Sequence, residues 1–482
     1  MFSFDNSYAR LPESFFSRME IVGPESPTLI KFNEALAAEL GLELENLLNQ
    51  DLARIFAGTV KPDGADPLAM AYAGHQFGNF VPQLGDGRAT LLGEVVDRFG
   101  RRRDIQLKGA GRTFYSRGGD GRAALGPVLR EYCVSEAMHA LGIPTTRAIA
   151  AVLTGEPVYR EQTLPGAVVT RVASSHIRVG TFQFFAARQD KDALKHLADY
   201  VIQRHYPEVA DTPEPYLNLL KAIIDRQAFL VSRWMQIGFI HGVMNTDNMS
   251  VAGETIDFGP CAFMDQYDPT TVYSAIDRGG RYAYQNQPGI AQWNLARLAE
   301  AMLPILAEDI DQAVALANPA VVGFAPAYQA YWLSGFRQKL GLMTERDEDR
   351  SLIEQCLQAM YEDKADFTLT FRTLAKGPAA FARSLSAKPA LTAWVEHYQT
   401  RLGLEPEFDS ARQQQMQKVN PAYIPRNHRI EQAIQAALQG NLSPFHQLVE
   451  VLAHPYDDQP QFAEYQVPPQ PEERVLQTFC GT

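Results

Sequence analysis

The sequence predicts an α+β fold in which a small β-rich lobe is followed by a larger helical lobe. Short apolar segments separated by glycine turns occupy residues 74–107, the pattern of strands and tight turns. Apolar residues recur at helical spacing over residues 125–141, and helical patterns dominate after residue 216, as expected for helices with one buried face. We therefore expect two lobes, residues 1–170 and residues 171–482.

Within the first lobe, the strands and the helix behind them can be placed in order. The segments RATLLGEVV and RRRDIQLK are joined through residues 97–100 and read as a β-hairpin. The helical pattern over residues 125–141 is stopped by Gly142 and Pro144, which are typical residues after a helix end. The predicted order is strands first, with a helix packed behind them.

The second lobe is expected to bring a polar segment between apolar elements. An amphipathic helix is predicted over residues 216–237, and Gly238 follows it, as at many helix C-termini. Directly after this glycine comes the polar segment IHGVMNTDNMSVAGETIDFGP, which we expect to form a hairpin. Helical patterns then return at residues 293–306, 352–360 and 429–438.

Charge and composition restrict the classes of function. The chain has 482 residues, a formal net charge of −12 and a pI near 5.4, so no overall cationic field attracts nucleic acid or an anionic membrane. No segment approaches the roughly 18 consecutive apolar residues that span a bilayer, and the N-terminal segment lacks the pattern of a signal peptide. We expect a cytoplasmic protein with no nucleic-acid and no membrane partner, whose phosphate binding comes from a local cluster of Lys and Arg.

The polar segment holds the densest group of chemically useful side chains. In phosphate-transfer enzymes Mg²⁺ is held by one or two protein oxygens and by nucleotide phosphates, and in kinases an Asn and the Asp of DFG supply those oxygens. Asn248 and Asp257, the first residue of DFG at 257–259, match that pattern. The alternative is an Asx-rich turn in which Asp257 only caps local backbone.

The spacing in the loop 241–248 favours the metal interpretation. A kinase catalytic loop reads H-R-D-x-x-x-x-N, and His241 and Asn248 have the same spacing. The Asp of that motif falls at Val243, whose side chain cannot accept a proton. Asp247 is the only carboxylate in this loop and is therefore the candidate general base.

Upstream, Lys108 and Glu131 follow in the order of the kinase Lys that binds phosphate and the helical Glu that orients it. Lys108 ends the DIQLK strand, and Glu131 lies in the helix that follows. Gly85 and Gly87 allow close approach of a ligand, although their spacing departs from the strict Gly-rich loop of kinases. Each of these residues alone reads as ordinary surface structure, but together and in this order they predict a nucleotide site.

A Gly- and Arg-rich stretch, GAGRTFYSRGGDGRAALG, separates Lys108 from that helix. Arg offers fixed, bidentate donors to phosphate oxygens, so the stretch suits a loop that folds over a polyphosphate. A flexible solvated loop is the alternative, above all for Arg112 and Arg117. Further along the chain, Arg171 and Arg178 add two more cations.

Three long strings carry a family resemblance: GHQFGNFVPQLGDGRATLLGE, DIQLKGAGRTFYSRGGDGRAALGPVLREY, and HGVMNTDNMS followed by DFGP. Together with NPAYIPRNHRIEQAI and VLAHPYDDQP near the C-terminus, they closely resemble the selenoprotein O family of protein adenylyltransferases. The resemblance spans nearly the whole chain. It implies a protein-kinase-like bilobal fold that binds ATP in a reversed orientation and moves AMP to Ser, Thr or Tyr hydroxyls of acceptor proteins.

The resemblance also implies roles in binding ATP. Lys108, held by Glu131, would bind the inner end of the triphosphate, aided by Arg171 and Arg178. The other residues at the ATP site would be Gly85, Gly87, Arg88, Asp120, Gly121 and Asp257.

For the chemical step, the resemblance implies that Asn248 and Asp257 hold Mg²⁺ and that Asp247 accepts the proton. Use of Mn²⁺ in place of Mg²⁺, and of UTP in place of ATP, stays open. Two other functions also stay open: kinase-type transfer of the γ-phosphoryl group with Asp247 as base, and a catalytically inactive ATP-binding pseudokinase scaffold.

The cysteines raise one question about regulation. Cys480 stands near the C-terminus, where many eukaryotic members of the family have selenocysteine, and some bacterial members are thought to form a disulfide from that end to a Cys shortly after DFG. The nearest candidate here is Cys261, and a redox switch between the two stays open. Cys133 and Cys356 are predicted to be buried, inert thiols.

Overall fold

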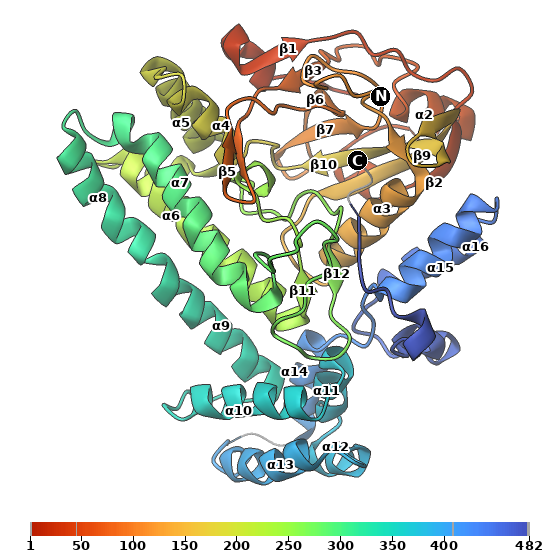
Figure 1. The fold of residues 1–482 in the computed structure, drawn as a ribbon, viewed down its shortest axis with the longest axis vertical. Coiled ribbons are helices and arrows are strands. Elements are labelled where there is room, and N and C mark those ends of the chain that lie inside the picture. Colours follow the sequence, from red (N-terminus) through yellow and green to blue (C-terminus); the bar gives the residue numbers. More distant parts are fainter. Residues whose placement is uncertain (1, 45, 407–408, 480–482) are drawn as a thin grey trace.

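A computed structural model describes residues 2–44, 46–406 and 409–479. Strands gather in the first part of the chain and helices dominate the rest (Figure 1). The fold is therefore a mixture of helices and one large antiparallel sheet, which agrees with the predicted α+β class. Cys480 lies outside the described residues, so its relation to Cys261 is not addressed by the structure.

Eight strands of the described chain form one sheet in the order β1-β3-β6-β7-β10-β9-β2, with β8 against β10, and every pairing in it is antiparallel. These strands are β1 (Phe16–Arg18), β2 (Thr28–Phe32), β3 (Leu68–Met70), β6 (Ala89–Val96), β7 (Arg102–Lys108), β8 (Ala123–Ala124), β9 (Arg147–Tyr159) and β10 (Thr163–Ala173). Two short pairs lie outside this sheet: β4 (Gly74–Gln76) with β5 (Asn79–Val81), and β11 (Phe239–Ile240) with β12 (Ala262–Phe263).

The hairpin of β6 and β7 places Lys108. Asp97 closes its turn by accepting backbone N–H groups from Phe99 and Arg101, both at 2.9 Å, and the register then pairs Lys108 with Ala89. Because side chains alternate along a strand, Lys108 shares one face of the sheet with Gln106 and Asp104, and the apolar Ile105 and Leu107 face the opposite side. The sequence predicted this hairpin, and the structure confirms it.

Helices cover both faces of the sheet. On one face, α1 (Glu34–Glu39) and α2 (Asn49–Phe56) bury Leu36 and Phe56 with sheet residues such as Ile105. On the other face, α3 (Leu125–Ala140) packs against β9 and β10. The predicted helix over residues 125–141 is thus confirmed to within one residue.

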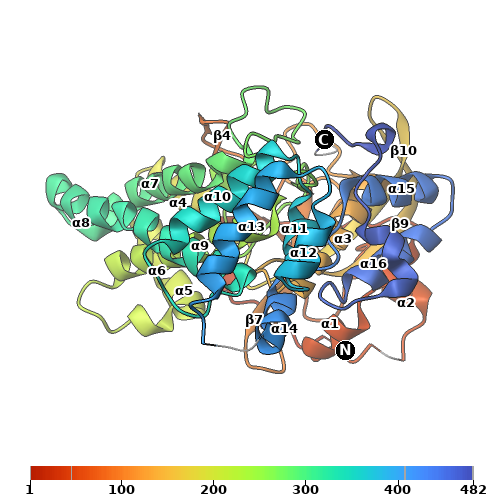
Figure 2. The same ribbon diagram turned by 90° about the horizontal axis from the view of Figure 1, so that it is seen from below.

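The C-terminal part of the chain returns to support α3. Helices α15 (Asn427–Leu438) and α16 (Ser443–Leu452) lie beside α3 in both views of the fold (Figures 1 and 2). Arg130 of α3 donates to Asn427 Oδ1 at 2.7 Å, and the rings of Tyr132 and Phe445 meet edge to face. The helix that carries Glu131 is therefore clamped between the sheet and the end of the chain.

The remaining helices form the larger part of the molecule. They are α4 (Val179–Ala186), α5 (Lys191–His205), α6 (Pro215–Ile237), α7 (Gln287–Leu306), α8 (Ile310–Val322), α9 (Phe324–Leu340), α10 (Asp349–Glu362), α11 (Phe367–Leu374), α12 (Pro378–Ser384), α13 (Pro389–Leu402) and α14 (Asp409–Val419). Helix α6 ends at Gly238 in the left-handed conformation, as predicted. The segment expected to be a polar hairpin does connect two antiparallel strands, the two-residue β11 and β12, but the connection between them is a long loop. Nowhere in the described ranges is a helix both long and apolar enough to cross a membrane.

Lys339 gives a testable feature of the helical core. Its ammonium is buried, donates to Asn420 Oδ1 at 2.8 Å and lies 4.3 Å from the centre of the Phe371 ring. Burial, reinforced by Arg233, lowers the pKa of Lys339 to about 7. Between that value and the pKa of about 10.4 in the unfolded chain, the unfolded state binds more protons, so the contribution of Lys339 to stability rises with pH.

We therefore expect the unfolding free energy of the wild type, relative to Lys339→Met, to increase between pH 7 and pH 9. The slope should approach about 1.4 kcal/mol per pH unit, measured by urea unfolding of both proteins at each pH. The exposed Lys221 on α6 supplies the control, since Lys221→Met should show no such slope. A difference for Lys339→Met that stays constant over this range would contradict the prediction.

Candidate active site

A cavity of about 670 Å³ lies where the sheet meets the loop between β11 and β12. Its volume falls within the range of sites for small ligands and cofactors. The candidate residues that line it are Gly85, Gly87, Arg88, Lys108, Asp120, Gly121, Arg171, Arg178, Asp247, Asn248 and Asp257. The fold thus brings to one place residues that lie as far apart in the sequence as 85 and 257. Glu131 is not in the wall and lies behind Lys108 and Arg171.

Lys108 is held between two carboxylates. Its ammonium donates to Glu131 Oε2 at 2.7 Å and to Asp257 Oδ1 at 3.1 Å. These contacts join the end of β7 to α3 on one side and to the DFG segment on the other. Lys108 therefore enters the cavity with its position fixed from both sides.

Two buried arginines complete this cluster. Arg171 donates to both Glu131 and Asp257, and Arg178 donates to Asp257 Oδ2 at 3.0 Å and to the backbone oxygen of Asp247 at 2.6 Å. Glu131 therefore orients Arg171 as well as Lys108, a sharing that sequence order did not indicate. Three cations are gathered at one end of the cavity, which is the arrangement that binds phosphate oxygens.

Electrostatics keep the two carboxylates of this cluster ionised. Burial opposes their ionisation, but the charges of Arg171 and Lys108 outweigh it and lower the pKa of Glu131 and, to well below the ordinary value, that of Asp257. Asp257 also has φ of +65°, a left-handed conformation that Asp adopts more readily than most residues. The backbone at the start of DFG is thus held in a conformation that costs energy and aims the carboxylate at the three cations.

The loop between β11 and β12 is tied down by its own side chains. His241 is buried and, with Nε2 protonated, donates to the backbone oxygen of Ile256 at 2.8 Å. Asn248 Nδ2 donates to the backbone oxygen of Val243 at 3.0 Å, which fixes the amide and leaves its Oδ1 with no hydrogen-bond partner in the described part of the chain. His241 is therefore a structural residue, and Asn248, which lines the cavity, keeps its Oδ1 available to accept or to ligate.

Asp247 has an unusual environment for a carboxylate. It is only 7% exposed, and Gln76 Nε2 donates to its Oδ2 at 3.2 Å. Its Oδ1 is buried and has no hydrogen-bond partner among the described residues. Burial raises its pKa to about 6. The pKa of this carboxyl group is therefore much closer to 7 than the pKa of an ordinary Asp, as is often true of a general base.

The glycines among the predicted residues allow close packing of the loop between Lys108 and α3. A Cβ on Gly85 would lie 2.2 Å from the ring of Tyr115, and one on Gly121 would lie 2.0 Å from the backbone oxygen of Gly111. Asp120 pairs with Arg160 at 2.8 Å, and this hydrogen bond lowers the pKa of Asp120 to about 2. Gly87 and Arg88 follow Gly85 along the same wall.

Sequence reasoning missed several residues of the cavity wall. Asp86 is 2% exposed, accepts the backbone N–H of Met70 at 3.1 Å, and lies 3.7 Å from Arg178. The guanidinium of Arg178 also lies over the ring of Tyr72, 4.5 Å from the ring centre. Gln76 contacts Asp247. A charged residue between two glycines was a usable signal for Asp86, whereas nothing in the local sequence marked Tyr72 or Gln76.

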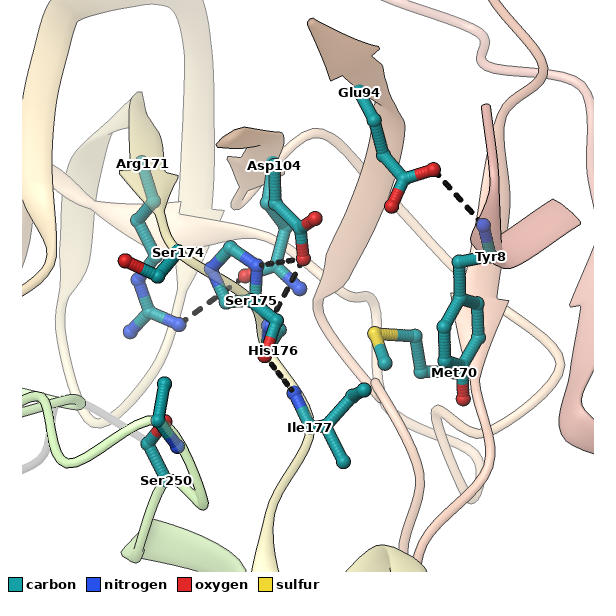
Figure 3. A network of polar contacts seen from close by, with 12 residues as sticks. Tyr8, Met70, Glu94, Asp104, Arg171, Ser174, Ser175, His176, Ile177 and Ser250 are labelled. Carbon is teal, nitrogen blue, oxygen red and sulfur yellow. Dashed lines mark hydrogen bonds and ion pairs between the residues drawn. The ribbon is translucent and has the colours of Figure 1, made fainter. Parts of the chain in front are cut away.

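Behind the cavity, a second buried network anchors the segment that leads to Arg178. Asp104 of β7 accepts both the backbone N–H and the ring Nδ1–H of His176, each at 2.9 Å (Figure 3). Burial opposes ionisation of Asp104, but Arg204 and His176 lower its pKa to about 2. Glu94 accepts the backbone N–H of Tyr8 in the same network at 2.8 Å (Figure 3). Because His176 is two residues from Arg178, these bonds help to fix the arginine.

A cavity lined by clustered cations, with a buried carboxylate of raised pKa beside them, defines an enzyme of the group-transfer class that acts on a phosphate-bearing substrate. Comparison with known proteins gives the family. The family model described as Protein adenylyltransferase SelO matches residues 1–453, and the chain belongs to this family.

Close relatives cover the whole chain. Protein nucleotidyltransferase YdiU of Rhizobium rhizogenes is 62% identical over 486 residues, which are 99% of this chain and 97% of the relative. Proteins of the same name from Rhizobium meliloti and Rhodopseudomonas palustris are each 61% identical, over 100% of this chain and 99% of the relative. The resemblance predicted from sequence strings is thereby confirmed, as is the class of enzyme, a protein nucleotidyltransferase.

Proposed function

We propose that the protein transfers AMP from ATP to Ser, Thr or Tyr hydroxyls of acceptor proteins in a cytoplasmic, metal-dependent reaction, with pyrophosphate as the leaving group. The observation that carries this proposal is the shared cavity, in which the cation cluster and the buried Asp247 face one space. Membership of the adenylyltransferase family supports AMP as the group that moves.

In this proposal the chain has a protein-kinase-like bilobal fold, with residues 1–170 as the β-rich lobe and residues 171–482 as the helical lobe. The antiparallel sheet, the helix behind it and the loop between β11 and β12 support that assignment. The pairing of Lys108 with Glu131 and the position of Asp257 support it further, since a kinase uses the same three roles to hold a nucleotide.

The triphosphate is proposed to lie against Lys108, Arg171 and Arg178. All three point into one end of the cavity and are held there by Glu131 and Asp257 before any ligand arrives. Preorganised cations stabilise developing negative charge without the cost of reorienting during the reaction. Gly85, Gly87, Arg88, Asp120 and Gly121, which lie along the same walls, are proposed to surround the rest of the ATP.

The residues present suit a hard divalent cation. Asn248 Oδ1 and the ionised Asp257 line the same cavity, and oxygen donors are what Mg²⁺ prefers. The described residues contain no cluster of three or more His, Cys, Asp or Glu that could hold a metal alone, so nucleotide phosphates would complete the coordination. We propose that Asn248 and Asp257 hold Mg²⁺, or Mn²⁺ in its place, and that the ion when bound neutralises phosphate charge.

Asp247 is proposed as the base that accepts the proton of the acceptor hydroxyl. Val243, at the position of the kinase carboxylate, lines the cavity with an apolar side chain, so no proton acceptor stands there. The two alternatives, γ-phosphoryl transfer and an inactive scaffold, use the same cavity and differ in the product.

Labelled ATP separates these three functions in one assay. The protein is incubated with a divalent metal, a generic acceptor protein and ATP labelled at either the α or the γ phosphate. We expect label in the acceptor only from α-labelled ATP. Label from γ-labelled ATP would instead indicate a kinase, and binding of ATP without labelling of the acceptor would indicate an inactive scaffold.

The raised pKa of Asp247 predicts the acid limb of the pH profile. A base acts in its deprotonated form, so kcat should be constant well above pH 6 and fall about tenfold per pH unit below it. Burial is the cause of this pKa near 6. Initial rates of AMP transfer at saturating ATP between pH 5 and pH 8 measure the pKa of this acid limb. The Tm recorded at each pH is the control for folding. An acid limb that stays near pH 4 would contradict the assignment.

A further inference from the structure

The β4–β5 hairpin, residues 74–81, stands apart from the main sheet and covers Asp247. Its strands pair Gln76 with Asn79 across a turn made by Phe77 and Gly78, both with positive φ, as in a two-residue turn that matches strand twist. The hairpin belongs to neither of the carboxylate and cation networks described above. Its position therefore needs a separate explanation.

Three successive residues of the hairpin bind three successive residues of the loop. His75 N–H donates to Thr246 Oγ1 at 2.7 Å, Gln76 Nε2 donates to Asp247 Oδ2 at 3.2 Å, and Phe77 N–H donates to Asn245 Oδ1 at 3.0 Å. Two of these contacts use the backbone of the hairpin. The contact to Asp247 alone comes from a hairpin side chain.

Neighbouring elements lock the outer two contacts. Gln183 of α4 holds both partners of the His75–Thr246 contact, because its amide contacts His75 Nδ1 at 2.8 Å and accepts from Thr246 Oγ1 at 2.6 Å. On the other side, Tyr282 donates to Asn245 Oδ1 at 2.6 Å. The hairpin is thus fixed relative to the loop whatever Gln76 does, so its side chain is free to serve another purpose.

The other oxygen of Asp247 faces the hairpin backbone. A Cβ on Gly74 would lie 2.4 Å from Asp247 Oδ1, so only glycine leaves room for the carboxylate in this orientation. In the part of the chain that the structure describes, Oδ1 has no hydrogen-bond partner, and the amide of Gln76 donates to Oδ2 of the carboxylate. Rotation of the carboxylate about its Cβ–Cγ bond is therefore restrained by one side-chain amide.

We infer that Gln76 is a positioning residue for Asp247. The side-chain amide of Gln76 sets the orientation in which the Asp247 carboxylate meets the acceptor hydroxyl. This inference rests on the proposed function, because it requires Asp247 to take part in the reaction. Gln76 lines the same cavity as Asp247. Its amide donates to Asp247 and not to Glu131 or Asp257, the carboxylates that hold the cation cluster. Its loss should therefore affect the chemical step and leave the binding of ATP unchanged.

The test compares two variants of similar side-chain length. Gln76→Met removes the donor, and misplacement of a catalytic group can cost about 10- to 100-fold in kcat. Gln76→Glu also replaces the donor by a second carboxylate facing Asp247, and we expect an equal or larger loss. Asn79→Ala, at the exposed paired position on the same hairpin, is the control and should keep the wild-type kcat. Tm and the Kd for ATP are measured for each protein.

A double-mutant cycle decides whether Gln76 acts through Asp247. If it does, Gln76→Met should cause no further loss of kcat in a protein that already carries Asp247→Ala. A further tenfold loss in that background, or a rise in the Kd for ATP that accounts for the whole effect, would overturn the inference. So would wild-type kcat in Gln76→Met when Asp247→Ala is impaired. Wild-type kcat in Asp247→Ala itself would instead remove the base assignment of the proposed function.

Discussion

Asp257→Ala should abolish turnover, with kcat for AMP transfer lowered by at least about 10³-fold, the upper range for loss of one electrostatic group in an active site. Asp257 accepts hydrogen bonds from Lys108, Arg171 and Arg178, and it is the carboxylate proposed to hold the metal ion. Its removal would lose both the ion and the fixed positions of the cations. Transfer of label from α-labelled ATP to an acceptor protein measures the effect.

Asp257→Asn is the more informative variant of this pair. Alanine is strained at φ of +65°, whereas Asn adopts that conformation readily, so only the charge is lost. We expect Asp257→Asn to be inactive too. The half-buried Asp268 lies outside the cavity wall, and its Oδ1 accepts from the backbone N–H of Thr270 at 2.8 Å. Asp268→Ala supplies the control and should keep wild-type activity. Near-normal activity of Asp257→Asn would remove the metal assignment.

Much of the cation cluster could be predicted because regular elements carry it. Lys108 ends a strand whose hairpin partner and turn were readable, and Glu131 lies on a helix with a clear apolar period. An antiparallel sheet with a helix packed on one face leaves few ways to arrange those two elements. Their contact at 2.7 Å is thus a consequence of patterns that are local in the sequence.

The surroundings of Asp247 could not be predicted in the same way. Gln76 and Gly74 are far from Asp247 in the sequence, and they reach it only because a small hairpin leaves the main sheet and folds over the loop. The periodic pattern of apolar residues in the sequence does not predict this contact, because neither strand of the hairpin belongs to the main sheet. The raised pKa of Asp247 has the same origin, because burial is created by tertiary packing and not by neighbouring residues.

Asp247→Ala should lower kcat by about 10²- to 10⁴-fold, the usual cost of losing a general base, while the Kd for ATP stays close to the wild-type value. The reason is that, among the described residues, the carboxylate of Asp247 makes no hydrogen bond to Lys108, Arg171 or Arg178. Arg178 donates to the backbone oxygen of Asp247 instead, and an alanine keeps that oxygen. Single-turnover rates together with equilibrium binding of ATP separate the two quantities.

The position of Asp247 beside Asn248 requires a second measurement. If Asp247 only supports the metal ligand Asn248, its loss should weaken metal affinity by about 10- to 100-fold, and a high concentration of Mg²⁺ should restore the rate. A rate that stays low at every Mg²⁺ concentration is expected for a lost base. Val243→Asp in the Asp247→Ala background completes the argument, since it restores a carboxylate at the kinase position. It should not restore AMP transfer if the acceptor hydroxyl approaches the α-phosphate from the side of Asp247, and its rescue with transfer of the γ-phosphoryl group would show that the cavity works as a kinase site.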